Sequence, residues 1–340
     1  MKLQLPLASA NGFQAIIPIF ISSAVHYSQM KKTKPASMLF TIYHIIISFL
    51  IIPGCGSTPE GAIQKPDQKS ITAIGYDLDN PDGTFILPPV LHEISGIAVF
   101  DSSSVACVQD ENGIIFIYDL SKKTITQNVT FYGNGDYEDI ARTAGAFYVL
   151  KSNGTLYKIS DMNRPLPPEE IHLKGIPHKD IEGLCFDSKN ERLLIAPKDK
   201  ADKDSEAEVK QGIYGYDLKT GELIKDPLIE FKLPAIKEFA ARVLEPVEYN
   251  KKGEPKKPDI RFSPSAIAIH PVTGRLYLLS ADDHMLFVFS LQGTIEHIVR
   301  LKPEIYNMAE GITFFQNGDM LISNEGQNGN ASLLRFRYHE

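Results

Sequence analysis

Five short segments of the chain are nearly alike, and their spacing is the strongest constraint on the fold. The aligned residues are Ser95, Glu138, Glu182, Ser265 and Glu310, which follow one another at intervals of 43, 44, 83 and 45 residues. A repeat of about 40–45 residues with several strands in each unit is typical of a β-propeller. The sequence therefore predicts an all-β fold in which each repeat forms one blade of a ring.

Composition narrows the class of partner. The chain has 340 residues and a formal net charge of −7, with 43% hydrophobic and 23% charged residues. Binding of nucleic acid relies on a basic surface, so we expect no nucleic-acid partner. Three cysteines are too few for a disulfide framework, and Cys107 and Cys185 lie in segments that read as buried strands.

The amino-terminal region is typical of an export signal. An apolar stretch, residues 38–52, follows a cluster of lysines and precedes the sequence Pro53-Gly54-Cys55-Gly56. A cationic segment, a short apolar segment and small residues at the cleavage point describe a secretory signal peptide. A cysteine directly after the cut resembles a bacterial lipoprotein signal, so residues 30–54 are predicted as the signal and Cys55 as the lipidated residue.

The alternative is a transmembrane helix that is retained, although the apolar stretch is shorter than the roughly 20 residues needed to span a bilayer. Residues 1–29 place a second apolar patch ahead of the lysines, and we expect translation to start at Met30. Residues 55–70 read as a flexible tether. The expected location is the bacterial cell envelope, where the lipid anchor at Cys55 holds the protein on a membrane.

The remaining residues, 71–340, are predicted to form the propeller. Four repeats supply four strands each, whereas the fifth lacks its last strand. The segment 71–78 reads as a strand without a repeat of its own, and we expect it to complete the fifth blade and close the ring. The long interval includes an insert at 234–262 with helical spacing of apolar residues at 235–244. Five blades are predicted, with six as the alternative.

Polar residues recur at one end of the predicted blades. In a four-stranded antiparallel blade, the start of the first strand and the end of the second lie on the same face of the ring. Starts of first strands supply Glu93, Glu138, Asp139, Glu182 and Glu310. Ends of second strands supply Asp110, Lys151, Lys198, Asn324 and Glu325. We expect these residues to surround one mouth of the central channel.

A group of carboxylates repels itself unless a cation or raised pKa values offset the charge. Oxygen ligands without histidine or cysteine suit Ca²⁺ best, and Glu138, Glu182 and Glu310 are the candidate ligands. The alternative is structural, because acidic residues at strand starts often accept hydrogen bonds from backbone amides and organise turns.

Motifs of catalysis are sparse. The sequence contains no G-x-S-x-G elbow, H-E-x-x-H helix or P-loop. Ser95 and His92 are close in sequence but do not make a triad. His178 lies near Asp180 and Glu182, where a surface imidazole is the simpler interpretation. His270 precedes a turn at the opposite end of its strand and is excluded from the candidate site.

The repeats also carry a family resemblance. The segments 93–98, 135–141, 180–184, 264–271 and 309–312 resemble those of the SdiA-regulated (YjiK-like) propellers over about residues 75–338. Members look like bacterial envelope proteins, often with an export signal, and the resemblance implies no established activity. The insert at 234–262 departs from the family pattern and could restrict access to one side of the ring.

Two functions follow from the sequence. The first is a membrane-tethered binding or scaffold module whose acidic mouth takes Ca²⁺, a small polar ligand or an envelope protein. The second is a metal-assisted hydrolase of a phosphate ester, lactone or ester, because the fold resembles that of calcium-using propeller enzymes. Fold alone licenses neither function. We favour binding, and we expect no enzyme activity other than that of a hydrolase.

Overall fold

The computed structural model describes residues 72–198, 211–246, 251–253, 256 and 258–340. The predicted signal peptide, Cys55 and the tether lie outside the described residues, as do parts of the insert.

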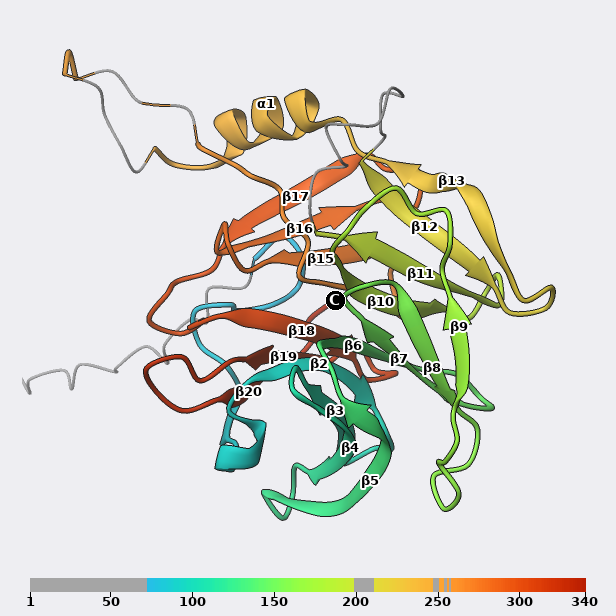
Figure 1. Ribbon diagram of the computed structural model, residues 1–340. Helices are drawn as coiled ribbons and strands as arrows, with labels where there is room; N and C mark the ends of the chain where they lie inside the picture. The colour runs from blue at the N-terminus through green and yellow to red at the C-terminus, as the bar shows by residue number, and fades with distance from the viewer. Residues whose placement is uncertain (1–71, 199–210, 247–250, 254–255, 257) are drawn as a thin grey trace, which may run out of the picture. The chain divides into compact units, whose positions relative to one another are not determined.

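Five antiparallel sheets of four strands make up the described fold (Figure 1). The first is β2 (Ile94–Val99), β3 (Ser104–Gln109), β4 (Asn112–Asp119) and β5 (Thr124–Asn134). The second is β6 (Tyr137–Arg142), β7 (Phe147–Lys151), β8 (Thr155–Ile159) and β9 (Glu169–His172). The third is β10 (Ile181–Asp187), β11 (Arg192–Pro197), β12 (Gly212–Asp217) and β13 (Glu222–Glu230). The fourth is β14 (Ala266–Ile269), β15 (Leu276–Ser280), β16 (Met285–Phe289) and β17 (Ile295–Arg300). The fifth is β18 (Ala309–Phe314), β19 (Met320–Asn324), β20 (Ser332–Phe336) and β1 (Gly83–Ile86).

The sheets form a closed ring of blades. The first strands β2, β6, β10, β14 and β18 each contact the first strands of the two neighbouring blades, and β18 returns to β2. Apolar residues of adjacent blades pack into five clusters, so the core is divided among the interfaces between blades. The prediction of a five-bladed propeller is confirmed, and the alternative of six blades is excluded.

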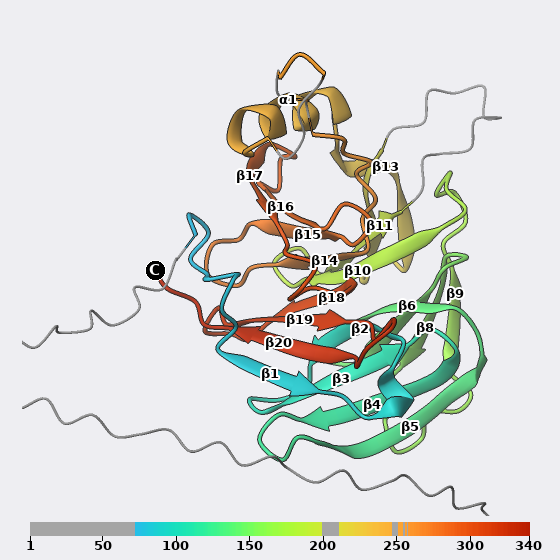
Figure 2. The same ribbon diagram turned by 90° about the vertical axis from the view of Figure 1, so that its left-hand side faces the viewer.

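The closing strand lies further along the chain than the sequence indicated. Strand β1, Gly83–Ile86, pairs antiparallel with β20 and supplies the fourth strand of the fifth blade (Figure 2). The prediction that an amino-terminal strand completes this blade is therefore confirmed, but its assignment to residues 71–78 is wrong. The described part of that segment contains turns and no strand.

Residues 72–78 instead pack between the fourth and fifth blades. Tyr76 is fully buried, and its hydroxyl donates a hydrogen bond of 2.5 Å to the carbonyl of Gly318. The same hydroxyl lies 2.7 Å from Nε2 of His270. The Tyr306 hydroxyl donates to the carbonyl of Leu78. Alternating apolar residues suggested a strand, but they face a cluster of aromatic rings rather than a sheet edge.

The helix predicted in the insert is present as α1, Leu233–Val243. Its buried residues, Ile236 and Ala240, pack in the cluster that includes residues of the fourth blade, and the helix contacts β17, the strand of that blade farthest from the channel (Figure 1). The described helix therefore does not cover the mouth of the channel, contrary to the expectation for the insert. A short 3₁₀ helix, Pro89–Leu91, precedes β2. Within the described residues, every helix is too short or too polar to cross a bilayer.

Candidate functional site

The recurring acidic residues occupy irregularities in the innermost strands. Ile181 pairs with Pro197 and Gly183 pairs with Ala196, so Glu182 is an extra residue in β10. Glu138 in β6 and Glu310 in β18 lie at equivalent shifts of register. A β-bulge leaves one residue unpaired and redirects its side chain. Three blades thus use the same local device at the same end of their first strands.

In β10 and β18 the bulge is followed by a glycine, Gly183 or Gly311, that allows the blades to approach closely. At Gly311, a Cβ atom would lie 2.4 Å from Oγ of Ser323 and 2.6 Å from the carbonyl oxygen of Ser95 in the next blade. The Ser323 hydroxyl donates to that carbonyl at 2.8 Å. The small residue after the bulge therefore keeps the inner strands, and with them the acidic side chains, close to the channel axis.

Side chains from four blades line one cavity of about 150 Å³ at this end of the channel. Seven of them are acidic and one is basic. They are Glu93, Asp110, Asp136, Glu138, Glu182, Glu310, Glu325 and Lys198. We call this set the acidic mouth. The structure thus brings together seven of the ten residues that the sequence singled out for a mouth, namely Glu93, Asp110, Glu138, Glu182, Lys198, Glu310 and Glu325.

Glu182 and Lys198 form an ion pair within the acidic mouth. Nζ of Lys198 lies 2.5 Å from Oε1 of Glu182, whose side chain is only 7% exposed. The other oxygen, Oε2, is buried and has no hydrogen-bond partner among the described residues. Burial raises the pKa of Glu182 to about 8, although Lys198 opposes that shift. One buried carboxylate oxygen is therefore left without compensation.

The neighbouring acids are also difficult to ionise. Burial, reinforced by Glu182 and Asp136, raises the pKa of Glu138 to about 9. Burial raises the pKa of Glu310 to about 7, against the lowering effect of Lys198. At Asp110, burial and the charge of Glu93 raise the pKa to about 6. Without a cation other than Lys198, the acidic mouth retains protons near neutral pH.

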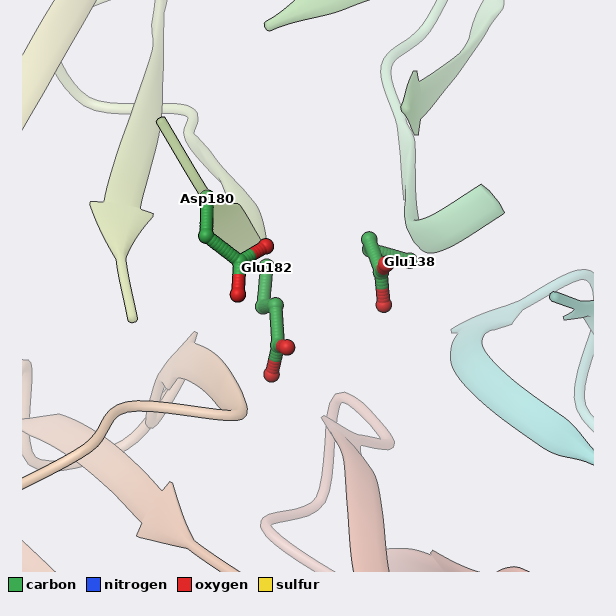
Figure 3. A group of neighbouring side chains, drawn as sticks. All are labelled: Glu138, Asp180 and Glu182. Atoms are coloured by element: carbon green, nitrogen blue, oxygen red, sulfur yellow. The ribbon is translucent and has the colours of Figure 1, made fainter. Parts of the chain in front are cut away.

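Two residues of the acidic mouth, together with the neighbouring Asp180, have the spacing of metal ligands. Glu138, Asp180 and Glu182 each offer a carboxylate oxygen, and these oxygens lie within 4.8 Å of one another. Figure 3 shows Asp180 and Glu182 together, with Glu138 facing them from the neighbouring blade. The sequence grouped Glu310 with Glu138 and Glu182. Glu310 lines the same cavity, but Asp180 takes its place in the described group.

Asp139 does not line the cavity. It is 3% exposed, and its two oxygens accept hydrogen bonds from the backbone N–H groups of Ile140, at 2.8 Å, and Leu184, at 2.7 Å. The expectation that it faces the mouth is wrong because Glu138 occupies the bulge and Asp139 follows it. Asp139 joins the second blade to the third, which is the structural role considered for acids at strand starts.

Lys151 and Asn324 are likewise absent from the lining. Lys151 ends β7, where it pairs with Tyr137. Asn324 ends β19, is almost completely buried, and its Nδ2 lies 3.5 Å from Oγ of Ser332. Both lie at the predicted end of the blade, but the lining of the acidic mouth does not include them.

Sequence reasoning missed Asp136 as a lining residue and Asp180 as a candidate ligand. Each lies two residues before a bulged glutamate, in the segments Asp136-Tyr137-Glu138 and Asp180-Ile181-Glu182. This shared spacing was the available signal. The fourth blade has Ser265 in place of an acid, and its hydroxyl donates to the carbonyl of Ala309 in the fifth blade.

No protein-family model matches the chain, and a search of curated proteins gives no match. Solved structures align with the chain at low similarity. Glutaminyl cyclase of Myxococcus xanthus aligns at 14% identity and a TM-score of 0.47, covering 76% of this chain and 95% of its own. A chain of a nidogen/laminin complex aligns at 11% identity and a TM-score of 0.44, covering 68% of this chain and 72% of its own. A luciferin-regenerating enzyme aligns at 10% identity and a TM-score of 0.42, covering 75% of this chain and 95% of its own. With every identity at or below 14% and every TM-score at or below 0.47, these alignments support no conclusion about this chain.

Proposed function

We propose that the protein is a binding module whose acidic mouth takes up a divalent cation. The observation that carries the proposal is the buried carboxylate of Glu182. Lys198 satisfies one of its oxygens, and the other has no partner among the described residues. A buried carboxyl group with one oxygen unpartnered ionises only at a cost, which raises its pKa, and a bound cation would take the place of the proton.

The chemistry of the lining favours Ca²⁺ over a transition metal. The described residues that line the mouth supply carboxylates and one serine but neither histidine nor cysteine. Ca²⁺ takes six to eight oxygen ligands, some of them water, whereas zinc and copper favour nitrogen or sulfur. A volume of about 150 Å³ accommodates an ion together with several waters, each of which occupies about 30 Å³.

Glu138, Asp180 and Glu182 are the proposed ligands, since their oxygens already lie within 4.8 Å of one another. Glu310 lies in the same cavity and adds negative charge close to the site. Lys198 competes with the ion for Glu182, and on ion binding its ammonium group becomes available to an anionic or polar ligand.

Calorimetric titration of the full-length protein with CaCl₂ tests the proposal. We expect saturable binding that Glu182→Gln and Glu138→Gln each weaken at least tenfold. Glu304→Gln is the matched control, because it removes one carboxylate from an exposed residue outside the mouth. Absence of saturable heat at millimolar Ca²⁺, or equal affinity in all four proteins, would contradict the proposal.

The envelope location belongs to the same proposal. The lysines at 31–34, the apolar stretch 38–52 and Cys55 support a lipid anchor, and the resemblance to SdiA-regulated (YjiK-like) propellers agrees with it. Mass spectrometry of the protein purified from bacterial membranes should show a diacylglyceryl group on Cys55 and no peptide from residues 1–29. A chain that retains residues 30–54 would support the transmembrane alternative instead.

A metal-assisted hydrolase is the second candidate. In this alternative Asp180 and Glu182 hold the ion and Glu138 is not a ligand. Its raised pKa of about 9 keeps Glu138 protonated at neutral pH, where it is able to act as a general acid. A screen of phosphate monoesters, esters and lactones with Ca²⁺ present tests it. Turnover that Glu138→Gln abolishes while Ca²⁺ still binds would favour the enzyme over the pure binding module.

A further inference from the structure

A second cavity, of about 410 Å³, lies where the five innermost strands end. All five of these strands run in the same direction along the channel, because each is the first strand of its blade. The starts of four of them, β2, β6, β10 and β18, line the acidic mouth, whereas later residues of all five line this cavity. We call it the opposite mouth. Its volume is within the range of about 300–1,000 Å³ typical of small-molecule sites.

The opposite mouth is built from repeated positions. Three residues beyond the aligned residue of each repeat stands a small side chain, and these are Ala98, Ala141, Cys185, Ala268 and Thr313. Because no large side chain occupies these five equivalent positions, the blades leave space between them near the axis. The cavity is therefore a consequence of the repeat itself, contributed by every blade.

The next position breaks the repeat. Four residues beyond the aligned residue, four blades carry a partly exposed apolar side chain: Val99, Phe186, Ile269 and Phe314. The second blade carries Arg142 instead, and Arg142 is the sole charged residue among those that line the cavity in the described structure. An apolar side chain at this position would continue the ring, so Arg142 gives the second blade a charge that the other four blades lack here.

Arg142 is held in place by uncharged groups. Its Nη1 donates to the carbonyl oxygens of Val99 and Phe100. Its guanidinium carbon lies 5.2 Å from the centre of the Phe100 ring and 5.7 Å from that of Phe147, two rings that stack on each other. No ion pair with a carboxylate is found for it in the described structure. The Nε and Nη2 edge of the guanidinium remains for a ligand.

From this geometry we propose that the opposite mouth binds a small organic carboxylate with an apolar body. The planar guanidinium edge matches a carboxylate through two parallel hydrogen bonds. The ring of Val99, Phe186, Ile269 and Phe314 suits an aliphatic or aromatic body. Thr143, Ser188, Thr313 and Gln316 add polar groups to the lining. A single cation fits a monoanion better than a phosphate dianion.

The test is titration of the full-length chain with hexanoate, hexylamine and acetate, in which ligand-observed NMR measures the binding. We expect saturable binding of hexanoate, at least tenfold weaker binding of acetate, and no saturable binding of hexylamine. Arg142→Gln should weaken hexanoate binding at least tenfold. Lys189→Gln is the matched control: it removes one exposed cation next to Ser188, outside the lining, and should leave the affinity unchanged.

A second variant reduces the volume of the cavity and leaves its charge unchanged. Ala144 is an exposed residue of the lining, in the turn after β6, and Ala144→Trp should narrow the cavity and weaken hexanoate binding at least tenfold while Arg142 is retained. Equal affinity of hexanoate for the wild type and Arg142→Gln, or tighter binding of hexylamine, would overturn the proposal. Both ligands are measured with EDTA and with Ca²⁺, so the result does not depend on the ion site.

Discussion

The two mouths of the channel have opposite chemistry, although four of the five blades that line the opposite mouth also line the acidic mouth. At the acidic mouth, bulged glutamates of three blades gather with other acids around Lys198. At the opposite mouth, the first strands of the five blades present small and apolar side chains and one arginine. The repeat thus sets the shape of both ends. Departures from it, a bulge at one end and Arg142 at the other, set the charge.

Asp139 separates the two mouths. Its buried carboxyl group follows the bulge of β6 and binds the backbone of β10, while the next residue, Ile140, lines the opposite mouth. An acid in the repeated segment is therefore a candidate ligand at one position and a structural residue at the next. The alternation of side chains along a strand decides which of the two it becomes.

Removal of the closing segment should have the largest effect, because both mouths need a complete ring. Deletion of residues 72–86 removes β1 and the buried Tyr76. We expect the variant to lose cooperative thermal unfolding and to bind neither Ca²⁺ nor hexanoate. Deletion of 56–70, which is of equal length and falls in the predicted tether, is the control. A cooperative transition near the wild-type temperature in the 72–86 deletion would show that the ring holds without its closing strand.

Loss of the carboxyl group between the mouths should destabilise the fold without abolishing it. Asp139→Ala leaves the buried N–H groups of Ile140 and Leu184 without their acceptors. We expect a loss of about 3 kcal/mol of unfolding free energy, since each unsatisfied buried group costs about 1–3 kcal/mol. Denaturation in urea measures it. Asp139→Asn keeps one acceptor oxygen and should lose less; an equal loss in both variants would argue against the hydrogen bonds as the cause.

The affinity of the acidic mouth for Ca²⁺ should depend on pH, whereas the affinity of the opposite mouth for hexanoate should not. Ca²⁺ must displace protons from Glu138 and Glu182, whose pKa values are raised to about 9 and about 8. Each proton released makes the apparent affinity rise about tenfold per pH unit below those values. Calorimetry between pH 6 and about 9 should show this rise. Hexanoate binding should be constant over the same range, because carboxylate and guanidinium keep their charges.

Stability without Ca²⁺ gives a related pH test. Folded Glu138 holds its proton up to about pH 9, whereas the unfolded chain releases it near 4.5. The folded state therefore binds more protons in this window, and stability should fall as pH rises. Urea denaturation of wild type and Glu138→Gln at several pH values measures the slope. An identical slope in the two proteins would contradict the assignment.

The smallest effect is expected beside the opposite mouth, at His270. Its Nδ1 accepts from the backbone N–H groups of Val272 and Thr273, so Nε2 carries the proton and donates to Tyr76. Burial lowers the pKa of His270 to about 4. The unfolded chain takes up a proton near 6.5, so stability should be lost as pH falls from 6.5 to about 4.

Tyr76→Phe tests the same network at constant pH. It removes the hydroxyl that links His270 to Gly318, and we expect a loss of about 1–2 kcal/mol. The unfolding free energy from urea denaturation at neutral pH measures it, with Tyr338→Phe as the control, since no hydrogen bond of its hydroxyl is found in the described structure. An equal or larger loss in the control would contradict the assignment of the effect to the hydrogen bonds of the Tyr76 hydroxyl.

Much of the fold could be predicted from repeat spacing. Five copies of one segment, each with strands and turns at similar intervals, indicated the blades, and helical spacing at 235–244 indicated α1. The closing strand was misplaced because residues 71–78 alternate in polarity as a strand does. In the structure the alternating residues Ile74, Tyr76 and Leu78 pack instead in a core cluster of the fourth and fifth blades, which are far from them in the sequence.

The candidate site was predictable only as a set of positions. Seven of the ten predicted mouth residues line one cavity, because strand starts and strand-two ends meet at one end of a blade. The bulges were not predicted, so Asp139 was included and Asp180 left out of the ligands. A shift of one residue in register sends a side chain to the opposite face, and local sequence patterns do not reveal such a shift.

The sequence by itself predicted a ring of repeated blades and the end of the ring at which acids gather, because both follow from a repeated pattern, whereas the structure decided for five blades over six. Only the tertiary structure decided which acids share a cavity, which one binds the backbone, and where the arginine of the second blade lies. Those outcomes depend on contacts between strands about 40 or more residues apart, and each contact is fixed by the closure of the whole ring rather than by its own segment.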